Sequence, residues 1–126
     1  MKYKKILVCY LFTKYDDKKS LINFVRNYKF NKSGVRHKLL ICFKLLNNKN
    51  ISSLKLSIKN LKYTEFNDDV TFNDYDFGSY KRVAQKYPSF IIFFFNSHSY
   101  PITKNWLKKL KREQKNLIGM KILKTY

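Results

Sequence analysis

A short polar segment directly after an apolar run is the best candidate for chemistry in this chain. Residues 96–99, Asn-Ser-His-Ser, follow the run 89–95, which is rich in Ile and Phe. Such a run is typical of a strand that helices cover on both faces. In open parallel sheets, ligands bind in the crevice outside the carboxyl ends of the strands. We therefore expect this tetrapeptide to line a binding site.

An acidic cluster forms a second candidate. Asp68, Asp69 and Asp74 lie close together in a chain that has 27 Lys and Arg but only eight Asp and Glu, for a net charge of +19. Acidic residues concentrated in so basic a chain favour a function for one of them. For each taken alone, the pattern predicts a solvated loop.

Alternating strand and helix patterns predict the elements that must position these residues. Strands are expected at 6–12, 38–46, 62–67 and 89–95, and helices around 21–28, 54–61, 80–87 and from about Thr103. Asp16 or Asp17 is expected to cap the first helix, and Ser33 and Gly34 to end it. The segment after Gly119 has the pattern of one more strand. The fold class is therefore α/β, a Rossmann-like parallel sheet of four or five strands with helices on both faces.

Composition limits the remaining possibilities. A chain of 126 residues with 44% hydrophobic residues forms one domain with a real core. Cys9 and Cys42 lie in apolar runs without further ligands nearby, which predicts buried free thiols in a reducing cytoplasm. No apolar run approaches the roughly 20 residues that span a bilayer. The basic cluster 108–115 forms either a solvated helix face or a contact surface for phospholipid headgroups or polyanions.

The order of these elements resembles the nucleotide-binding half of GT-A fold glycosyltransferases, close to family 2. The matching parts are ILVCYLFTKYDD, the loop after HKLLICFKLLNN, the turn DYDFGSYKRVAQKYP, and FIIFFFNSHSYPITKNWLKKL. The strand, polar tip, Pro and Trp-Leu helix of the last part are similar to bacterial surface-polysaccharide transferases. The resemblance implies a nucleotide-diphosphate sugar as donor and a glycan or lipid-linked acceptor. It also implies a cytoplasmic protein, either free or peripheral at the inner face of the membrane.

The resemblance further implies roles for individual residues. His98, beside Asn96, stands where the family has a metal-binding Asp, so Mn²⁺ is a better expectation there than Mg²⁺. Without a metal ion, Arg82 or Lys81 would balance the diphosphate charge. A hydrogen-bonding loop residue is the other interpretation of His98. The remaining donor-binding candidates are Tyr10, Phe12, Thr13, Asn47, Asp76 and Gly78.

Structural interpretations of several candidates stay open beside the functional ones. Tyr10 and Phe12 lie where the family packs the nucleotide base, but they suit the core equally well. Asp76 and Gly78 either approach the ribose or base, or form a turn whose Asp caps a helix and whose Gly has a positive φ. Asn47 replaces a base-contacting Asp of the family.

Residues 1–126 are thus expected to form a single nucleotide-sugar-binding half domain that lacks the acceptor half. No general base is assigned, and the chain is either a piece of a larger transferase or a half that binds without catalysis. The alternative is a non-enzymatic basic α/β module that binds nucleic acid or an anionic membrane surface. The chain has neither a G-x-G-x-x-G nor a P-loop motif, which disfavours dinucleotide and P-loop sites.

Overall fold

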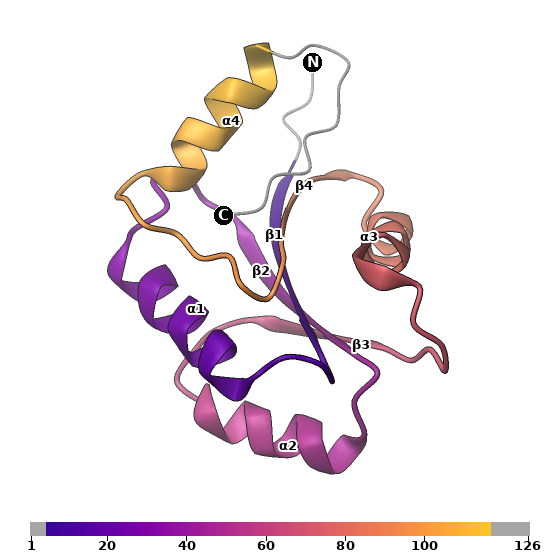
Figure 1. Cartoon of the computed structure of the whole chain (residues 1–126). Helices are drawn as coiled ribbons and strands as arrows, with labels where there is room; N and C mark the ends of the chain where they lie inside the picture. Colours follow the sequence, from indigo (N-terminus) through magenta and orange to yellow (C-terminus); the bar gives the residue numbers. More distant parts are fainter. Residues whose placement is uncertain (1–4, 117–126) are drawn as a thin grey trace.

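The computed structural model of the chain describes residues 5–116, which form alternating strands and helices (Figure 1). The order along the chain is β1 (Lys5–Thr13), α1 (Lys18–Phe30), β2 (Lys38–Lys44), α2 (Asn48–Ser57), β3 (Thr64–Asp68), α3 (Tyr75–Lys86), β4 (Phe90–Phe95) and α4 (Trp106–Asn116). The predicted βα alternation is confirmed. The strand expected after Gly119 lies outside the described residues.

The four described strands form one parallel sheet in the order β3-β2-β1-β4. In its register, Cys9 of β1 lies opposite Leu40 of β2 and Phe94 of β4. The chain first adds strands on one side of β1 and then crosses to the other side for β4. The boundary between β1 and β4 is therefore the point at which the strand order reverses.

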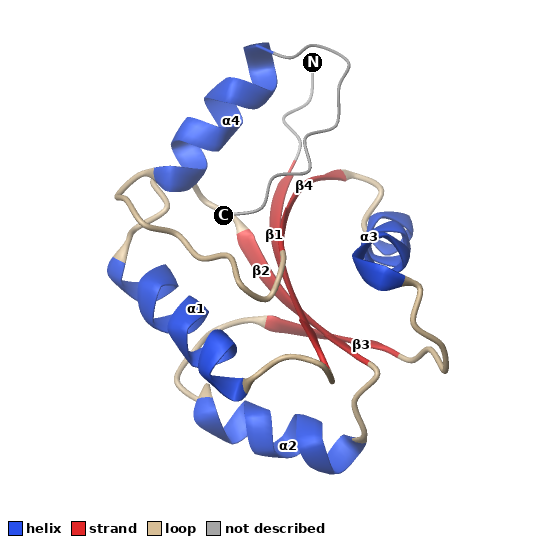
Figure 2. Cartoon of the chain, in the orientation of Figure 1, coloured by secondary structure: helices blue, strands red, loops and turns tan. Residues whose placement is uncertain are grey.

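Helices cover both faces of the sheet, as predicted (Figure 2). The larger core packs β1, β2 and β4 against α1, α2 and α4, with Phe24, Leu54 and Leu107 among the buried side chains. The smaller core packs the opposite sheet face against α3 through Tyr80 and Val83. Right-handed crossovers explain this division, because α3 makes the one connection that runs back across the sheet.

Helix starts differ from the sequence expectations for local reasons. Asp17 caps α1, with its carboxylate accepting from the Lys19 amide, so this prediction is confirmed. Asn47 caps α2 in the same way, so α2 begins at Asn48, earlier than the helix predicted around 54–61. The helix predicted from about Thr103 begins at Trp106, after Asn105 adopts a φ of 62°.

Both cysteines are free and buried, as predicted. Burial raises the pKa of the Cys9 and Cys42 thiols, which keeps them protonated and chemically inert. None of the helices described between residues 5 and 116 has the length and apolar character needed to cross a membrane.

Candidate functional site

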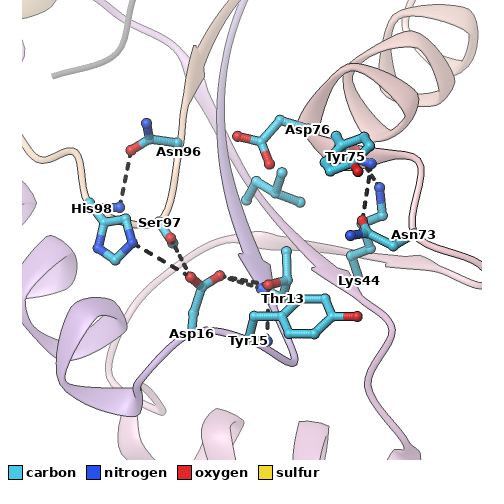
Figure 3. Close-up of a pocket in the computed structure, with 11 residues that line it drawn as sticks. Thr13, Tyr15, Asp16, Lys44, Asn73, Tyr75, Asp76, Asn96, Ser97 and His98 are labelled. Carbon is cyan, nitrogen blue, oxygen red and sulfur yellow. Dashed lines mark hydrogen bonds and ion pairs between the residues drawn. The ribbon is translucent and has the colours of Figure 1, made fainter.

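A pocket of about 270 Å³ lies at the point where the strand order reverses. Its walls come from the ends of β1 and β2, the loop after β4 and the start of α3 (Figure 3). The lining residues are Leu11, Thr13, Tyr15, Asp16, Lys44, Asn73, Tyr75, Asp76, Asn96, Ser97 and His98. The polar segment 96–98 thus lines a pocket beyond the carboxyl ends of parallel strands.

Asp16 joins the tips of β1 and β4 across this pocket. One carboxylate oxygen accepts from the Thr13 amide at 2.8 Å and from the Thr13 hydroxyl at 2.9 Å. The other accepts from the Ser97 hydroxyl at 2.6 Å and lies 3.8 Å from His98 Nε2. Asp16 therefore holds the two strand ends that form the pocket floor at a fixed spacing.

A network of paired charges supports the opposite wall. Arg82 binds Asp68 at 2.5 Å and Asp74 at 2.8 Å, and the Ser79 hydroxyl donates to Asp68 at 2.6 Å. Lys44, only 1% exposed, binds Asp74 at 2.5 Å. Burial opposes ionisation of Asp68, but the hydrogen bonds from Arg82 and Ser79 outweigh it, so the pKa of Asp68 is lowered. Hydrogen bonds from Arg82 and Lys44 hold the pKa of Asp74 well below its usual range.

This network also fixes the backbone of Tyr75 at the pocket rim. Tyr75 has a φ of 61°, a conformation that costs a non-glycine residue free energy. Two contacts hold it there, since its amide donates to Asn73 at 3.0 Å and its carbonyl accepts from the Lys44 ammonium. The Tyr75 side chain is 75% exposed and that of Tyr15 is 66% exposed. Two aromatic rings of the pocket lining are thus largely open to solvent.

Asp76 extends from the first turn of α3 toward the strand tips (Figure 3). Burial and the nearby carboxylate of Asp16 raise the pKa of Asp76. The His98 side chain is 77% exposed at the pocket edge. Among the residues that the structure describes, no three His, Cys, Asp or Glu side chains are arranged to hold a metal ion. A bound Mn²⁺ or Mg²⁺ stays a prediction.

Four of the predicted donor-binding residues line the pocket together: Thr13, Asp76, Asn96 and His98. Tyr10 and Phe12 lie in the larger core instead, where the Tyr10 hydroxyl donates to the Ser97 carbonyl at 2.7 Å and so supports the pocket from below. Asn47 caps α2 and is not among the lining residues.

Gly78 and Arg82 are not among the lining residues, but both support the α3 side of the pocket. Gly78 lies inside α3 and has no positive φ, so the interpretation as a left-handed turn residue is wrong. A Cβ at Gly78 would lie 1.9 Å from the Asp74 carboxylate, so the close approach of this side chain requires glycine here. Arg82 is engaged by two carboxylates, which leaves it poorly placed to balance a diphosphate.

The prediction of a solvated loop is wrong for Asp68 and Asp74 and is confirmed for Asp69, which is exposed. Asp68 is buried and Asp74 is paired with two cations, because the cluster neutralises Lys44 and Arg82. Sequence reasoning also missed Lys44 and Asp16 as lining residues. Lys44 lies inside the strand predicted at 38–46, and its charge within that apolar run was the one available signal.

The fold and the pocket define the class of this protein, a Rossmann-like α/β protein with a polar pocket where the strand order reverses. No family model matches the chain, and neither a curated protein nor a solved structure matches it.

Proposed function

We propose that the pocket binds a nucleotide-diphosphate sugar, as the donor half of a glycosyltransferase. The observation that carries the proposal is the position of the pocket. It lies outside the carboxyl ends of β1 and β4, where doubly wound parallel sheets bind nucleotides.

The wall around α3 supports binding of the diphosphate. Lys44 lines the pocket, and its ammonium binds Asp74 and the Tyr75 carbonyl, so it anchors the start of α3 at the pocket. The carboxylate of Asp74, the residue before α3, is occupied by Lys44 and Arg82 and makes no side-chain cap to the helix. First-turn amides of α3 that lack this cap are suitable donors to phosphate oxygens. The diphosphate is therefore expected at the start of α3, which Lys44 holds in place.

The rest of the lining supports binding of the base and the sugar. Tyr15 and Tyr75 offer aromatic surfaces, which stack on planar bases and on sugar rings. Asp76 and Asn96 offer hydrogen-bonding groups suited to ribose or hexose hydroxyls. A volume of about 270 Å³ lies just below the usual range for ligand sites, so part of the donor would extend from the open side.

The proposal concerns donor binding. Transfer to a cell-surface glycan or a lipid-linked acceptor also needs an acceptor site and, for an inverting reaction, a carboxylate base. We assign neither to a residue of this chain. The expected setting is the cytoplasmic side of a membrane.

Thermal unfolding with a panel of nucleotide sugars tests the proposal. Uridine, guanosine and cytidine diphosphate sugars are added with and without Mn²⁺, and one of them is expected to raise the unfolding temperature by mass action. Comparison with the matching nucleoside separates base binding from diphosphate binding. The proposal fails for this chain if no donor changes the unfolding temperature.

A second candidate function, a non-enzymatic module that binds nucleic acid or an anionic membrane, is favoured by the net charge of +19. It predicts strongly salt-dependent retention on heparin or anionic vesicles and no response to nucleotide sugars.

A further inference from the structure

We propose that one corner of the molecule docks onto the surface of an anionic phospholipid bilayer. This corner, called here the α1–α4 corner, consists of residues 29–33 at the end of α1 and residues 101–108 at the start of α4. The inference does not depend on the proposed function, because no residue of the corner lines the pocket.

Four hydrogen bonds join the two segments of the corner. The Asn31 side chain donates to the Pro101 carbonyl at 3.1 Å, and the Trp106 indole donates to the Asn31 carbonyl at 3.0 Å. The backbone amides of residues 105 and 108 donate to the carbonyls of residues 32 and 33 at 2.7 and 3.2 Å. Figure 1 shows the end of α1 beside the segment that leads into α4. The corner is therefore a preformed surface made of two distant parts of the chain.

Two large apolar side chains are exposed at this corner. Phe30 is 84% exposed and Ile102 is 70% exposed. Each is the immediate chain neighbour of a residue in the Asn31–Pro101 hydrogen bond, which places the two at the same corner. A single exposed apolar residue needs no explanation, but two on hydrogen-bonded segments place apolar side chains on the same preformed surface.

Positive charge surrounds these apolar residues. Segments 26–38 and 100–112 together contain ten Lys and Arg residues and no Asp or Glu. Lys29, Lys32, Lys104 and Lys108 are all exposed. Six of the eight acidic residues of the chain lie instead at or after the carboxyl ends of β1 and β3, or at the start of α3. The two segments that form the corner are thus rich in positive charge and free of acidic residues.

The combination of apolar and basic side chains favours a bilayer over nucleic acid. Apolar side chains that enter the headgroup region, together with lysines that attract anionic lipids, are the two usual contributions to interfacial binding. Single-stranded nucleic acid would instead be bound by basic and aromatic groups, and Ile102 has no ring on which a base could stack.

Cosedimentation of the full chain with vesicles tests this proposal. The vesicles contain phosphatidylcholine with increasing phosphatidylglycerol, and binding is expected to rise with the anionic fraction and to fall with salt. The Phe30→Ser/Ile102→Ser double variant should bind about tenfold more weakly. Replacing Lys29, Lys32, Lys104 and Lys108 with Gln should weaken binding by about fivefold per lysine.

Matched variants away from the corner make the test specific. Leu56→Ser removes an apolar side chain that is 71% exposed on α2, and Gln at the exposed residues Lys49, Lys59, Lys62 and Lys86 removes the same charge elsewhere. Both controls should bind vesicles almost as the unchanged chain does. Equal losses in the corner and control variants would overturn the proposal, because only net charge would then matter. Binding to single-stranded DNA with little binding to vesicles would also overturn it.

The response to nucleotide sugars is measured on the same variants and is expected to stay unchanged. Failure of the membrane proposal and failure of the proposed function are therefore separate outcomes. Far-ultraviolet circular dichroism confirms that the variants remain folded, as expected for changes at exposed positions.

Discussion

The buried carboxylate of Asp68 is the residue on which the pocket wall most depends. Its side chain is 2% exposed and binds both Arg82 and Ser79. We expect Asp68→Asn to lower the free energy of unfolding by about 3 kcal/mol at pH 7, because the change leaves Arg82 without a full partner. Urea unfolding of both proteins measures the difference.

The pH dependence of that difference follows from the lowered pKa of Asp68. A carboxyl whose folded pKa lies below its unfolded value of about 3.9 stabilises the protein above that value, and the stabilisation is lost as the pH falls through the folded pKa. The penalty of Asp68→Asn should therefore shrink below about pH 4. Asp69→Asn at the exposed neighbour is the control and should change little. If the loss of stability in Asp68→Asn does not depend on pH, the ion pair between Asp68 and Arg82 is not the source of that loss.

Gly78 allows the close approach of Asp74 to α3. Gly to Ala inside a helix normally stabilises it by about 1 kcal/mol, but here the added Cβ would displace a carboxylate that binds Lys44 and Arg82. Gly78→Ala should therefore destabilise the protein. In an Asp74→Ala background, where the clash is absent, the same change should be stabilising. A double-mutant cycle of unfolding free energies tests this, and additive effects would contradict the account.

Replacing Tyr75, which has a positive φ, is expected to affect stability and ligand binding in opposite directions. Tyr75→Gly should relieve about 1 kcal/mol of backbone strain and yet weaken ligand binding, because the ring at the pocket rim is lost. Asn105→Gly relieves a similar conformation away from the pocket and should leave binding unchanged. Unfolding and ligand titration are measured for both variants. Equal ligand affinities would exclude a role for the Tyr75 ring.

At the scale of elements, the pocket depends on the spacing between the ends of β1 and β4. Asp16 spans them through Thr13 and Ser97, whereas its neighbour Asp17 caps α1. Asp16→Ala should weaken nucleotide-sugar binding about tenfold through misplaced strand ends. Asp17→Ala should cost about 1 kcal/mol of stability and leave affinity unchanged. The reverse pattern, with affinity dependent on Asp17, would contradict this assignment.

Most of the elements could be predicted from the sequence because their signals are local. Apolar runs such as 89–95 and the cap at Asp17 need no tertiary information. The predicted starts of α2, α3 and α4 differ from the observed ones. Asn-rich and aromatic segments are weak helix signals, and no sequence pattern marks the left-handed conformations of Tyr75 and Asn105.

The candidate site was predicted only in part because it is formed by residues that lie far apart in the sequence. The polar tip at Asn96 and His98 follows a strand and was therefore visible in the sequence. Lys44 and Asp74 are 30 residues apart, and only the folded sheet shows that they pair. The sequence alone likewise could not distinguish Arg82 as a partner of two carboxylates from Arg82 as a ligand for phosphate.

At the scale of the whole molecule, the pocket and the α1–α4 corner differ in charge. Asp16 and Asp76 line the pocket, whereas the corner has four exposed lysines and no acidic residue. The 13 residues of α1 separate these regions by roughly 20 Å. In the proposed arrangement, a bilayer contact at the corner leaves the pocket open to a soluble donor.

Calorimetric titration with nucleotide-diphosphate sugars tests the central claim most directly. The unchanged chain and Lys44→Met are titrated with the donor that gives the largest thermal shift and with its nucleoside. Saturable binding of one donor is expected, with weaker binding of the nucleoside and a loss of about tenfold or more in donor affinity in Lys44→Met, because the start of α3 loses the ammonium that anchors it. Absence of saturable binding to every donor, or binding of equal strength in Lys44→Met, would contradict the assignment of this pocket to a nucleotide sugar.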